Sequence, residues 1–229
     1  MSMPFYVSPE QVMKDRADYA RNGIARGRSL VALEGPFGIL IVADNPSRTL
    51  NKIAEIYDRI AFAAVGKYNE FQMLKVAGVR FADVKGYSFS REDVSAQELA
   101  NTYAQTLGQV FTHEMKPYEV ELLVAEVGEG VEADHALYHI LYDGTVMDEE
   151  RYSVLGGDAD RIGEALEQEY RDDLDLAGAL ALGAKVLGGE NGPLSGEALE
   201  VALLDPTREQ RAFRRIKNSE LEELLPASG

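Results

Sequence analysis

The sequence contains no cysteine, and this absence excludes disulfide bonds, thiolate nucleophiles and cysteine-ligated metal sites. It is also poor in basic residues: 23 Lys and Arg stand against 39 Asp and Glu, which gives a formal net charge of -16. A surface this negative repels phosphate backbones and anionic lipid headgroups. We therefore expect no nucleic-acid partner and no membrane partner, and the lack of cysteine favours a reducing compartment.

Long hydrophobic runs are missing as well. No apolar stretch reaches the roughly 18 residues that a membrane-spanning helix needs. The first residues, MSMPFYVSPEQ, show neither the basic start nor the long apolar centre of a secretory signal. These features predict a cytoplasmic protein.

What the sequence does contain is typical of a folded globular domain. Hydrophobic residues make up 45% and charged residues 27% of a chain of 229, which is enough for one sizeable domain with its own core. A first helix is predicted to begin after Ser8, because serine caps free backbone N–H groups and Pro9 fits the first turn. Apolar residues recur at helical spacing as far as Ile24, and Gly23 and Gly27 mark the end of the helix. We expect this helix to lie against another surface.

Further along the chain, strands and helices follow one another in blocks. β-Branched runs separated by turn residues predict a hairpin at 29–44 and a strand pair at 52–66, and helical periodicity predicts helices at 68–84 and 95–116. The second half has the same order: strands at 118–128 and 136–156, helices at 158–171 and 175–187, two closing strands and a final helix at 218–225. Each sheet must bury two apolar faces, so this order favours an α+β protein in which two stacked sheets lie between outer helices, a four-layer αββα sandwich.

Two other motifs indicate no cofactor. His135 and His139 lie four residues apart beside Asp134, a spacing that suits a metal site on a helix. The segment has the pattern of a strand instead, in which such residues are roughly 13 Å apart, so we expect no metal. The glycine-rich segment 188–196, GGENGPLSG, lacks the lysine-serine ending of a phosphate-binding loop, and we interpret it as a surface loop.

The run DYARNGIARGRSLVAL, followed by GILIVADNPSRTLNKIAEIYDRIAFAAVGKYNEF, resembles proteasome α-subunits, most of all the bacterial α-subunits of actinobacteria. The likeness extends from the SPEQ helix start through LANTYAQTLGQVFT and KPYEVELLVAEV to RAFRRI. It implies the N-terminal-nucleophile hydrolase fold with an extra N-terminal helix. It also implies that seven α-subunits form each end ring of a barrel around two catalytic rings of β-subunits.

The residue at the head of the first strand distinguishes the α type from its catalytic sibling. In the β-type sibling a propeptide is removed there, and the exposed threonine becomes the nucleophile. In RGRSLVAL that position is Arg28, which has no nucleophilic oxygen, although Asp44 and Lys52 match the aspartate and lysine that assist the threonine. Ser29 is one residue late, so its side chain is expected on the opposite face of the strand. The resemblance therefore implies a subunit without catalytic residues.

The resemblance also implies a docking pocket between adjacent α-subunits for the C-terminal tail of a hexameric regulatory ATPase. The residues that match this pocket are Lys52, Gly66, Lys67, Tyr68 and Arg21. The lysine ammonium is suited to pairing with a terminal carboxylate. Without the family, these residues also fit a solvated lysine, an ordinary strand-to-helix turn and a local ion pair with Asp18.

The first residues are expected, by resemblance, to form a gate at the ring axis. This gate segment covers residues 1–7, ahead of a single domain at 8–225 and a flexible tail at 226–229. The residues assigned to the gate are Met3, Phe5, Tyr6, Val7, Ser8 and Pro9. The tyrosine-aspartate-arginine motif that holds the gate open in archaeal and eukaryotic relatives is absent before Ser8.

The implied function is ATP-dependent degradation of proteins tagged by a small modifier. The unfolded substrate enters through the gated α ring after the ATPase docks, and the β-subunits cut it. Two rivals remain open at this point. One is an N-terminal-nucleophile peptidase that is active in its own right. The other is a free-standing binding module that belongs to no barrel.

Overall fold

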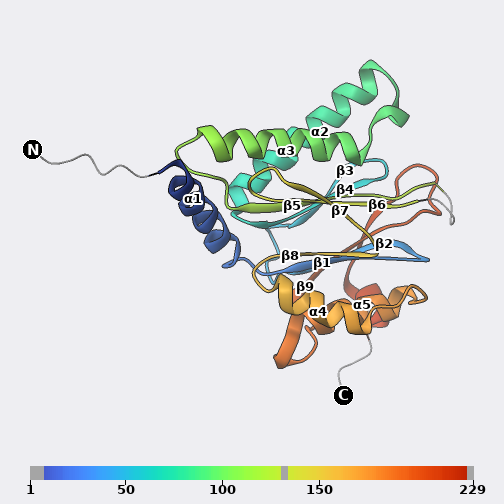
Figure 1. Ribbon diagram of the computed structural model, residues 1–229. Helices are drawn as coiled ribbons and strands as arrows, with labels where there is room; N and C mark the ends of the chain where they lie inside the picture. Colours follow the sequence, from blue (N-terminus) through green and yellow to red (C-terminus); the bar gives the residue numbers. More distant parts are fainter. Residues whose placement is uncertain (1–7, 130–133, 226–229) are drawn as a thin grey trace, which may run out of the picture.

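The computed structural model describes residues 8–129 and 134–225. Its first element is helix α1 (Pro9–Ile24), which begins where the sequence predicts. The Ser8 side chain accepts a hydrogen bond of 3.2 Å from the Gln11 N–H, and proline occupies the first turn. Only Ala20 and Ile24 of this helix are buried, so most of it lies on the surface at one end of the molecule (Figure 1).

The first of two sheets has the strand order β10-β9-β2-β1-β8, and every pair of neighbours is antiparallel. Its strands are β1 (Leu30–Gly35), β2 (Gly38–Asp44), β8 (Tyr152–Leu155), β9 (Leu199–Leu204) and β10 (Phe213–Ile216). The hairpin predicted at 29–44 is confirmed by the pairing of β1 with β2, in which Leu30 lies opposite Ala43.

The second sheet has the order β3-β4-β5-β6-β7 and is also antiparallel. Its strands are β3 (Ile53–Tyr57), β4 (Ile60–Gly66), β5 (Val120–Glu126), β6 (Ala136–Ile140) and β7 (Val146–Glu149). The turn at Asp143 and Gly144 joins β6 to β7, and Gly144 has a φ of 89° there.

Helices cover the outer face of each sheet, as Figure 1 shows. Helices α2 (Tyr68–Ser88) and α3 (Ala96–His113) lie on the second sheet, joined through the short 3-10 helix η1 (Arg91–Asp93). The other outer layer contains α4 (Ala159–Glu169), α5 (Leu176–Gly188) and α6 (Asn218–Leu224), with the 3-10 turns η2 (Gly189–Asn191) and η3 (Gly196–Ala198). The predicted four-layer αββα sandwich with an additional N-terminal helix is confirmed.

Strand alternation divides the core into three layers. Leu30 and Ala32 of β1 belong to the cluster between the two sheets, whereas Val31 and Leu33 face the α4–α5 layer. A third cluster lies between the second sheet and helices α2 and α3. Because successive strand residues point to opposite faces, a single strand contributes to two clusters. This alternation determines toward which side of the sheet each side chain at the start of β1 points.

One strand block departs from the sequence interpretation. Segment 136–156 was expected as one block of strands, but β7 ends in the second sheet and β8 begins in the first. Arg151, with a φ of 73°, lies at this crossing. Its guanidinium is 2.9 Å from Asp172 Oδ1 and lies over the Tyr170 ring, and these contacts hold the crossover against α4 and the loop that follows it.

Three smaller expectations concern loops, metals and membranes. Segment 188–196 is a partly exposed loop that contains η2 and the start of η3, as interpreted. His139 lies in a strand, and residues 8–129 and 134–225 hold no cluster of three or more His, Asp or Glu suited to a metal ion. Over the same residues, none of the helices has the length and apolarity that crossing a bilayer requires.

Candidate functional site

The connection from α1 to β1 brings Arg28 to one end of the two sheets. Gly27 permits a close approach there: a Cβ on Gly27 would lie 3.0 Å from Val65 Cγ1 and 3.2 Å from the Gly66 nitrogen. The Arg28 guanidinium then reaches the last residue of β2. Its Nη1 is 2.9 Å from Asp44 Oδ1 and 3.0 Å from Asp44 Oδ2.

Lys52 completes this group from the residue before β3. Its Nζ donates to the Arg28 carbonyl oxygen at 2.5 Å and to the Asp44 carbonyl oxygen at 3.0 Å. The structure thus brings Arg28, Asp44 and Lys52 together at the head of β1, as the family resemblance implies. Burial, countered in part by the charges of Asp44 and Glu200, lowers the pKa of Lys52 to about 8.

Glu200 supports this group from β9, and the sequence interpretation missed it. Its carboxylate is buried and accepts from the Lys52 N–H at 2.7 Å and the Ile53 N–H at 3.2 Å. Arg215 Nη1 lies 2.7 Å from Glu200 Oε1, the oxygen that also accepts from Ile53, and balances the charge of the carboxylate. The available signal was one acidic residue in the otherwise apolar run ALEVALL.

Ser29 lies on the other face of the strand. Its carbonyl oxygen accepts from the Asp44 N–H at 3.1 Å, so its backbone is part of the site. Alternation places its side chain on the face of Val31, and a Cβ built on Gly156 would be 2.7 Å from Ser29 Oγ. The hydroxyl is therefore turned away from the Arg28 face.

The turn from β4 into α2 lies next to Lys52. The Ala64 N–H donates to the Lys52 carbonyl oxygen at 3.1 Å, two residues before Gly66. Gly66 has a φ of 108°, and a Cβ there would be 1.9 Å from the Glu119 carbonyl oxygen. Glycine is therefore required for this turn to pack against the start of β5.

A charge network fixes the first turn of α2. Glu70 is buried and accepts from Lys116 Nζ and from the Glu119 N–H, both at 2.7 Å. Lys67 Nζ lies 3.8 Å from Glu70 and 3.7 Å from Glu119. Tyr68, half-buried, packs edge-on against Phe71 at 5.1 Å between ring centroids. The exposed ammonium of Lys67 therefore has carboxylates beside it, and the network around Glu70 was not predicted from the sequence.

Arg21 interacts with other parts of the fold. Its Nη1 is 3.6 Å from Asp18 Oδ1, and its guanidinium lies over the Tyr142 ring at 5.7 Å. The local ion pair considered from the sequence is thus present. Of the residues assigned to the gate, Met3, Phe5, Tyr6 and Val7 lie outside the described residues, while Ser8 caps α1 and Pro9 begins it.

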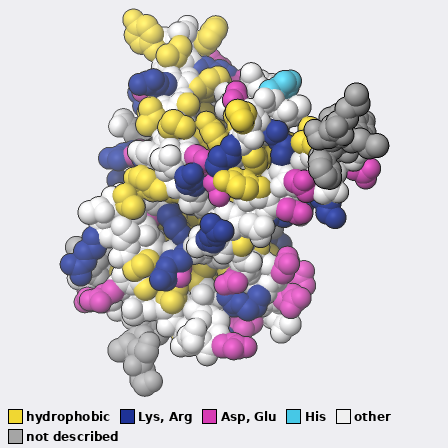
Figure 2. Space-filling view, turned by 90° about the vertical axis from the view of Figure 1, so that its left-hand side faces the viewer, with side chains coloured by type: hydrophobic (Ala, Val, Ile, Leu, Met, Phe, Trp, Pro, Cys, Tyr) yellow, Lys and Arg dark blue, Asp and Glu magenta, His cyan; other side chains and the backbone are white. Residues whose placement is uncertain are grey.

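The face that carries α1 is mixed in charge. Figure 2 views this face directly and shows basic and hydrophobic side chains across its centre, with several acidic side chains along its right-hand and lower margins. Val12, Met13 and Tyr19 of α1 are exposed apolar residues on the protein surface.

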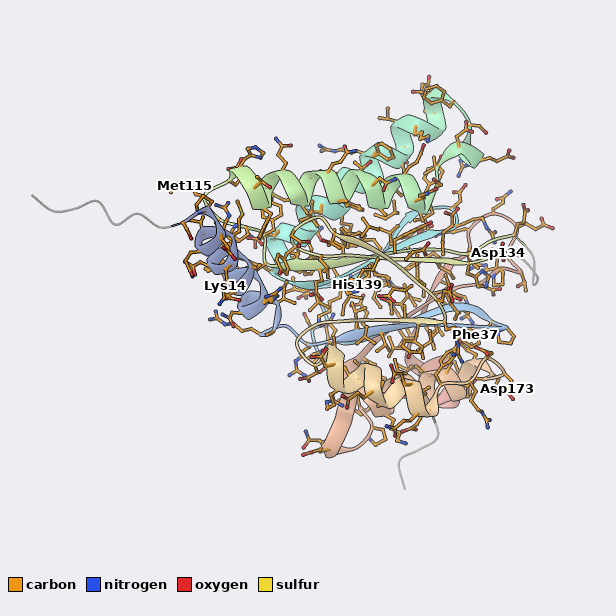
Figure 3. The ribbon with its side chains drawn as sticks, in the orientation of Figure 1. Lys14, Phe37, Met115, Asp134, His139 and Asp173 are labelled. Atoms are coloured by element: carbon orange, nitrogen blue, oxygen red, sulfur yellow. The ribbon has the colours of Figure 1, made fainter. Side chains whose placement is uncertain are left out.

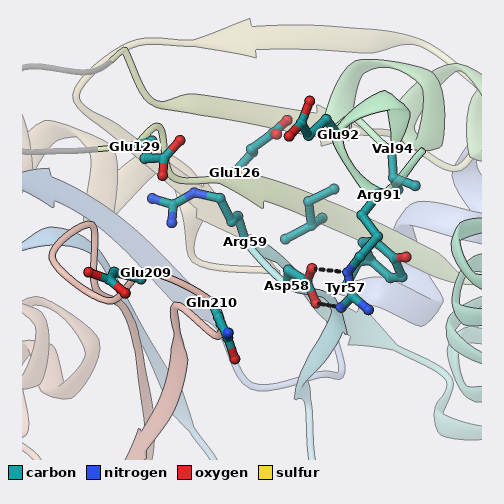
Figure 4. Close-up of a pocket in the computed structure, with 11 residues that line it drawn as sticks. Tyr57, Asp58, Arg59, Arg91, Glu92, Val94, Glu126, Glu129, Glu209 and Gln210 are labelled. Atoms are coloured by element: carbon teal, nitrogen blue, oxygen red, sulfur yellow. Dashed lines mark hydrogen bonds and ion pairs between the residues drawn. The ribbon is translucent and has the colours of Figure 1, made fainter. Parts of the chain in front are cut away.

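The described residues form a cavity at the far end of the sheets. It measures about 610 Å³ and lies at the β3–β4 turn, whereas Lys52 lies at the opposite end of β3. Figure 4 shows its lining, in which Arg91 pairs with Asp58 and Arg59 points toward the side of the cavity that holds Glu129. Neither Arg28 nor Lys52 belongs to this cavity.

A buried ion pair lies between the two sheets. His139 of β6, labelled in Figure 3, has its Nε2 3.6 Å from Glu121 and its Nδ1 3.7 Å from Glu149. Burial lowers the pKa of His139, but these two carboxylates outweigh burial, so its pKa is raised above the ordinary value. Glu121 also accepts from the Gly156 N–H at 3.2 Å and so connects the two sheets.

Comparison with known proteins identifies the family. The family model for proteasome subunits matches residues 24–203. The chain is 57% identical to proteasome subunit alpha of Acidimicrobium ferrooxidans, over 98% of this chain and 97% of that protein. It is 56% identical to proteasome subunit alpha of Kineococcus radiotolerans over all of both chains, and of Thermobifida fusca over 98% and 91%. The chain therefore belongs to the proteasome subunit family, and within it to the α-subunits of the actinobacterial type.

Proposed function

We propose that this chain is a non-catalytic ring subunit of a cytoplasmic proteasome core particle. Arg28 carries this proposal, because a guanidinium paired with Asp44 stands where the catalytic relatives have their threonine. In the uncleaved chain α1 precedes Arg28, and the Arg28 nitrogen belongs to a peptide bond that cannot act as a base. A β-subunit supplies the nucleophile, and an unfolded protein is the substrate.

The same site docks the C-terminal tail of a hexameric regulatory ATPase. Lys52 offers an ammonium at the edge of the sandwich, and an ammonium binds a terminal carboxylate by charge-assisted hydrogen bonds. Gly66, Lys67 and Tyr68 lie at the adjoining turn and line the path of the tail. Arg21 completes the pocket from α1, where Asp18 holds its guanidinium.

Exposed apolar side chains at two places on the molecule provide the ring contacts. The exposed residues of α1, such as Val12 and Met13, pack against a neighbouring α-subunit in a heptameric ring. At the far end of the molecule, Tyr87 and Phe89 are 94% and 77% exposed, at the tip where α2 ends (Figure 1). This tip contacts the β-subunit ring, because it points away from the end that carries α1 and Lys52.

The segment before α1 forms the gate over the pore. The proposal rests on the family and on the position of Ser8 and Pro9, which begin α1 at the exposed end of the molecule. Ser8 lies at the same end of the molecule as Lys52, the end proposed to receive the ATPase. The proposed docking pocket and the proposed gate would therefore lie at the same end of the molecule.

Assays of peptide hydrolysis test whether this chain or the β-subunit carries the catalytic residues. The chain alone should be inactive, and hydrolysis should appear only when its β-subunit is added and should be unaffected by Ser29→Ala in this chain. The retained Asp44 and Lys52 favour the rival hypothesis of an active peptidase. Activity of this chain alone that is lost in Ser29→Ala, with an intact mass showing cleavage before Ser29, would establish that rival instead.

A further inference from the structure

The charge on Lys52 has no carboxylate partner within ion-pair distance among residues 8–129 and 134–225. Both acceptors of its Nζ are backbone carbonyl oxygens, those of Arg28 and Asp44. The nearby Asp44 carboxylate is engaged instead by Arg28, through contacts of 2.9 and 3.0 Å from one nitrogen to both oxygens. Arg28 thus occupies the carboxylate that would otherwise be the nearest anion for Lys52.

Competition between carboxylates decides how strongly Lys52 binds an incoming anion. A carboxylate fixed in the protein has no translational entropy to lose, so it competes effectively with the carboxylate of a mobile peptide. The Asp44 side chain is only 15% exposed, which strengthens any interaction with a neighbouring cation. An unpaired Asp44 would therefore bind the Lys52 ammonium and block it.

We propose that Arg28 is a positioning residue for carboxylate docking: by holding the Asp44 carboxylate, it leaves the Lys52 ammonium free for the C-terminal carboxylate of a partner peptide. This inference rests on the proposed docking function of Lys52. Arg28 occupies the position that holds a nucleophile in the catalytic relatives, but its role here is different. It determines whether Lys52 pairs with the Asp44 carboxylate or with the carboxylate of the peptide.

The charge balance of the group supports this role. Two cations, Arg28 and Lys52, face one carboxylate, Asp44, which leaves a net positive charge at the site. Glu200 does not cancel that charge, because Arg215 lies 2.7 Å from its carboxylate. Removal of the Arg28 charge would leave one cation facing one anion, and an approaching carboxylate would lose its electrostatic attraction.

The test is binding of a fluorescent peptide to the chain assembled with its β-subunit. The probe is the last ten residues of the regulatory ATPase from the same organism, with a free C-terminal carboxylate or with an amide. Arg28→Gln should weaken binding of the free-acid peptide by about tenfold. Adding Asp44→Asn to this variant should restore binding to within about threefold of the original protein, because the competing carboxylate is gone.

Three variants make the result specific. Arg28→Lys retains a cation for Asp44 and should bind the peptide as the original protein does. Arg211→Ala removes an exposed arginine that pairs with Glu55 elsewhere, and should have no effect. Lys52→Ala should abolish the difference between the acid and the amide peptide.

A second test, which needs no peptide, measures the pKa of Lys52 by NMR titration in the full-length chain. The pKa of Lys52 should rise in Arg28→Gln, because Asp44 then pairs with the ammonium, and should fall again when Asp44→Asn is added. This measurement does not depend on the ATPase.

The outcomes separate this inference from the function on which it rests. Unchanged binding in Arg28→Gln overturns the inference, and the docking function stands if Lys52→Ala still abolishes acid-specific binding. Weakened binding that Asp44→Asn does not restore also overturns it, because Arg28 would then contact the peptide directly. Acid-specific binding that survives Lys52→Ala overturns both.

Discussion

At the scale of single residues, the head of β1 shows how one side chain changes the chemistry of a site. A threonine-type peptidase needs a hydroxyl and a base at one point. Here Asp44 and Lys52 are in place, but Arg28 supplies positive charge instead of an oxygen nucleophile. The same backbone framework thus suits binding of an anion.

The depressed pKa of Lys52 predicts that the proposed docking depends on pH. The ammonium is charged below its pKa of about 8 and neutral above it, so affinity for the carboxylate peptide should decrease as pH rises from 7 to 9.5. Lys52→Arg keeps its charge throughout this range and should remove the dependence. Fluorescence polarisation at each pH measures the peptide affinity of the original protein and of Lys52→Arg. An equal dependence in Lys52→Arg would contradict the assignment to Lys52.

His139 is predicted to contribute stability that depends on pH. Its pKa is raised in the folded protein, so the stabilisation is fully present below the unfolded pKa of roughly 6.5 and is lost as pH rises through the folded pKa. His139→Gln leaves Glu121 and Glu149 without their cation and should cost about 3 kcal/mol at pH 6. The cost should be smaller at pH 9.

Thermal unfolding of His139→Gln and the original protein at the two pH values measures this difference. His113→Gln is the matched control, because His113 is exposed at the end of α3. If His139→Gln lowers the Tm equally at pH 6 and pH 9, the ion pairs of His139 with the two carboxylates do not contribute to stability.

At the scale of elements, local patterns in the sequence predict most helices and hairpins. Ser8 and Pro9 predict the start of α1, and Asp143 with Gly144 predicts the β6–β7 turn, because capping and turn chemistry involve only neighbouring residues. The crossing at Arg151 was not predicted, since strand 152–155 pairs with a partner more than 100 residues away.

The site was predicted in part for the same reason. Arg28, Asp44 and Lys52 were found through family resemblance and meet in the structure as expected. Glu200 lies 148 residues from Lys52 in the sequence, and its role follows only from the pairing of β9 with β2. Buried charges of this kind depend on tertiary contacts, which no local spacing reveals.

The β4–α2 turn should tolerate no side chain at Gly66. Gly66→Ala places a Cβ against the Glu119 carbonyl oxygen in a backbone conformation that alanine disfavours, and should cost about 2 kcal/mol or more. Gly163→Ala on α4 meets no atoms within 4 Å and should be neutral or stabilising by up to about 1 kcal/mol. Chemical denaturation compares the two. Equal stability of both variants would contradict the turn geometry.

At the scale of the whole molecule, the two ends of the sandwich have different surfaces. One end carries α1, Arg28 and Lys52, and the other carries the apolar tip of α2 (Figure 1). The ring assembly that we propose would use such a difference, with the β ring on one side of each α-subunit and the ATPase on the other. The net charge of -16 helps keep the unassembled chain in solution.

The tip of α2 is predicted to be needed for assembly. The double variant Tyr87→Ser, Phe89→Ser removes two highly exposed aromatic side chains and should fold normally but fail to form particles with the β-subunit. Met73→Ser, at an exposed site nearer the beginning of α2, should assemble as the original protein does. Size-exclusion chromatography of the mixed chains measures assembly. Normal particles from the double variant would place the β contact elsewhere.

We propose above all that the end of the sandwich at Arg28, Asp44 and Lys52 docks a regulatory ATPase and does not cut substrate. The most direct measurement compares ATPase-stimulated protein degradation by particles with Lys52 and with Lys52→Ala, once native mass spectrometry has shown intact rings. We predict that stimulation falls by about tenfold in Lys52→Ala, because the docking charge is lost. Equal stimulation by intact Lys52→Ala particles would contradict the account.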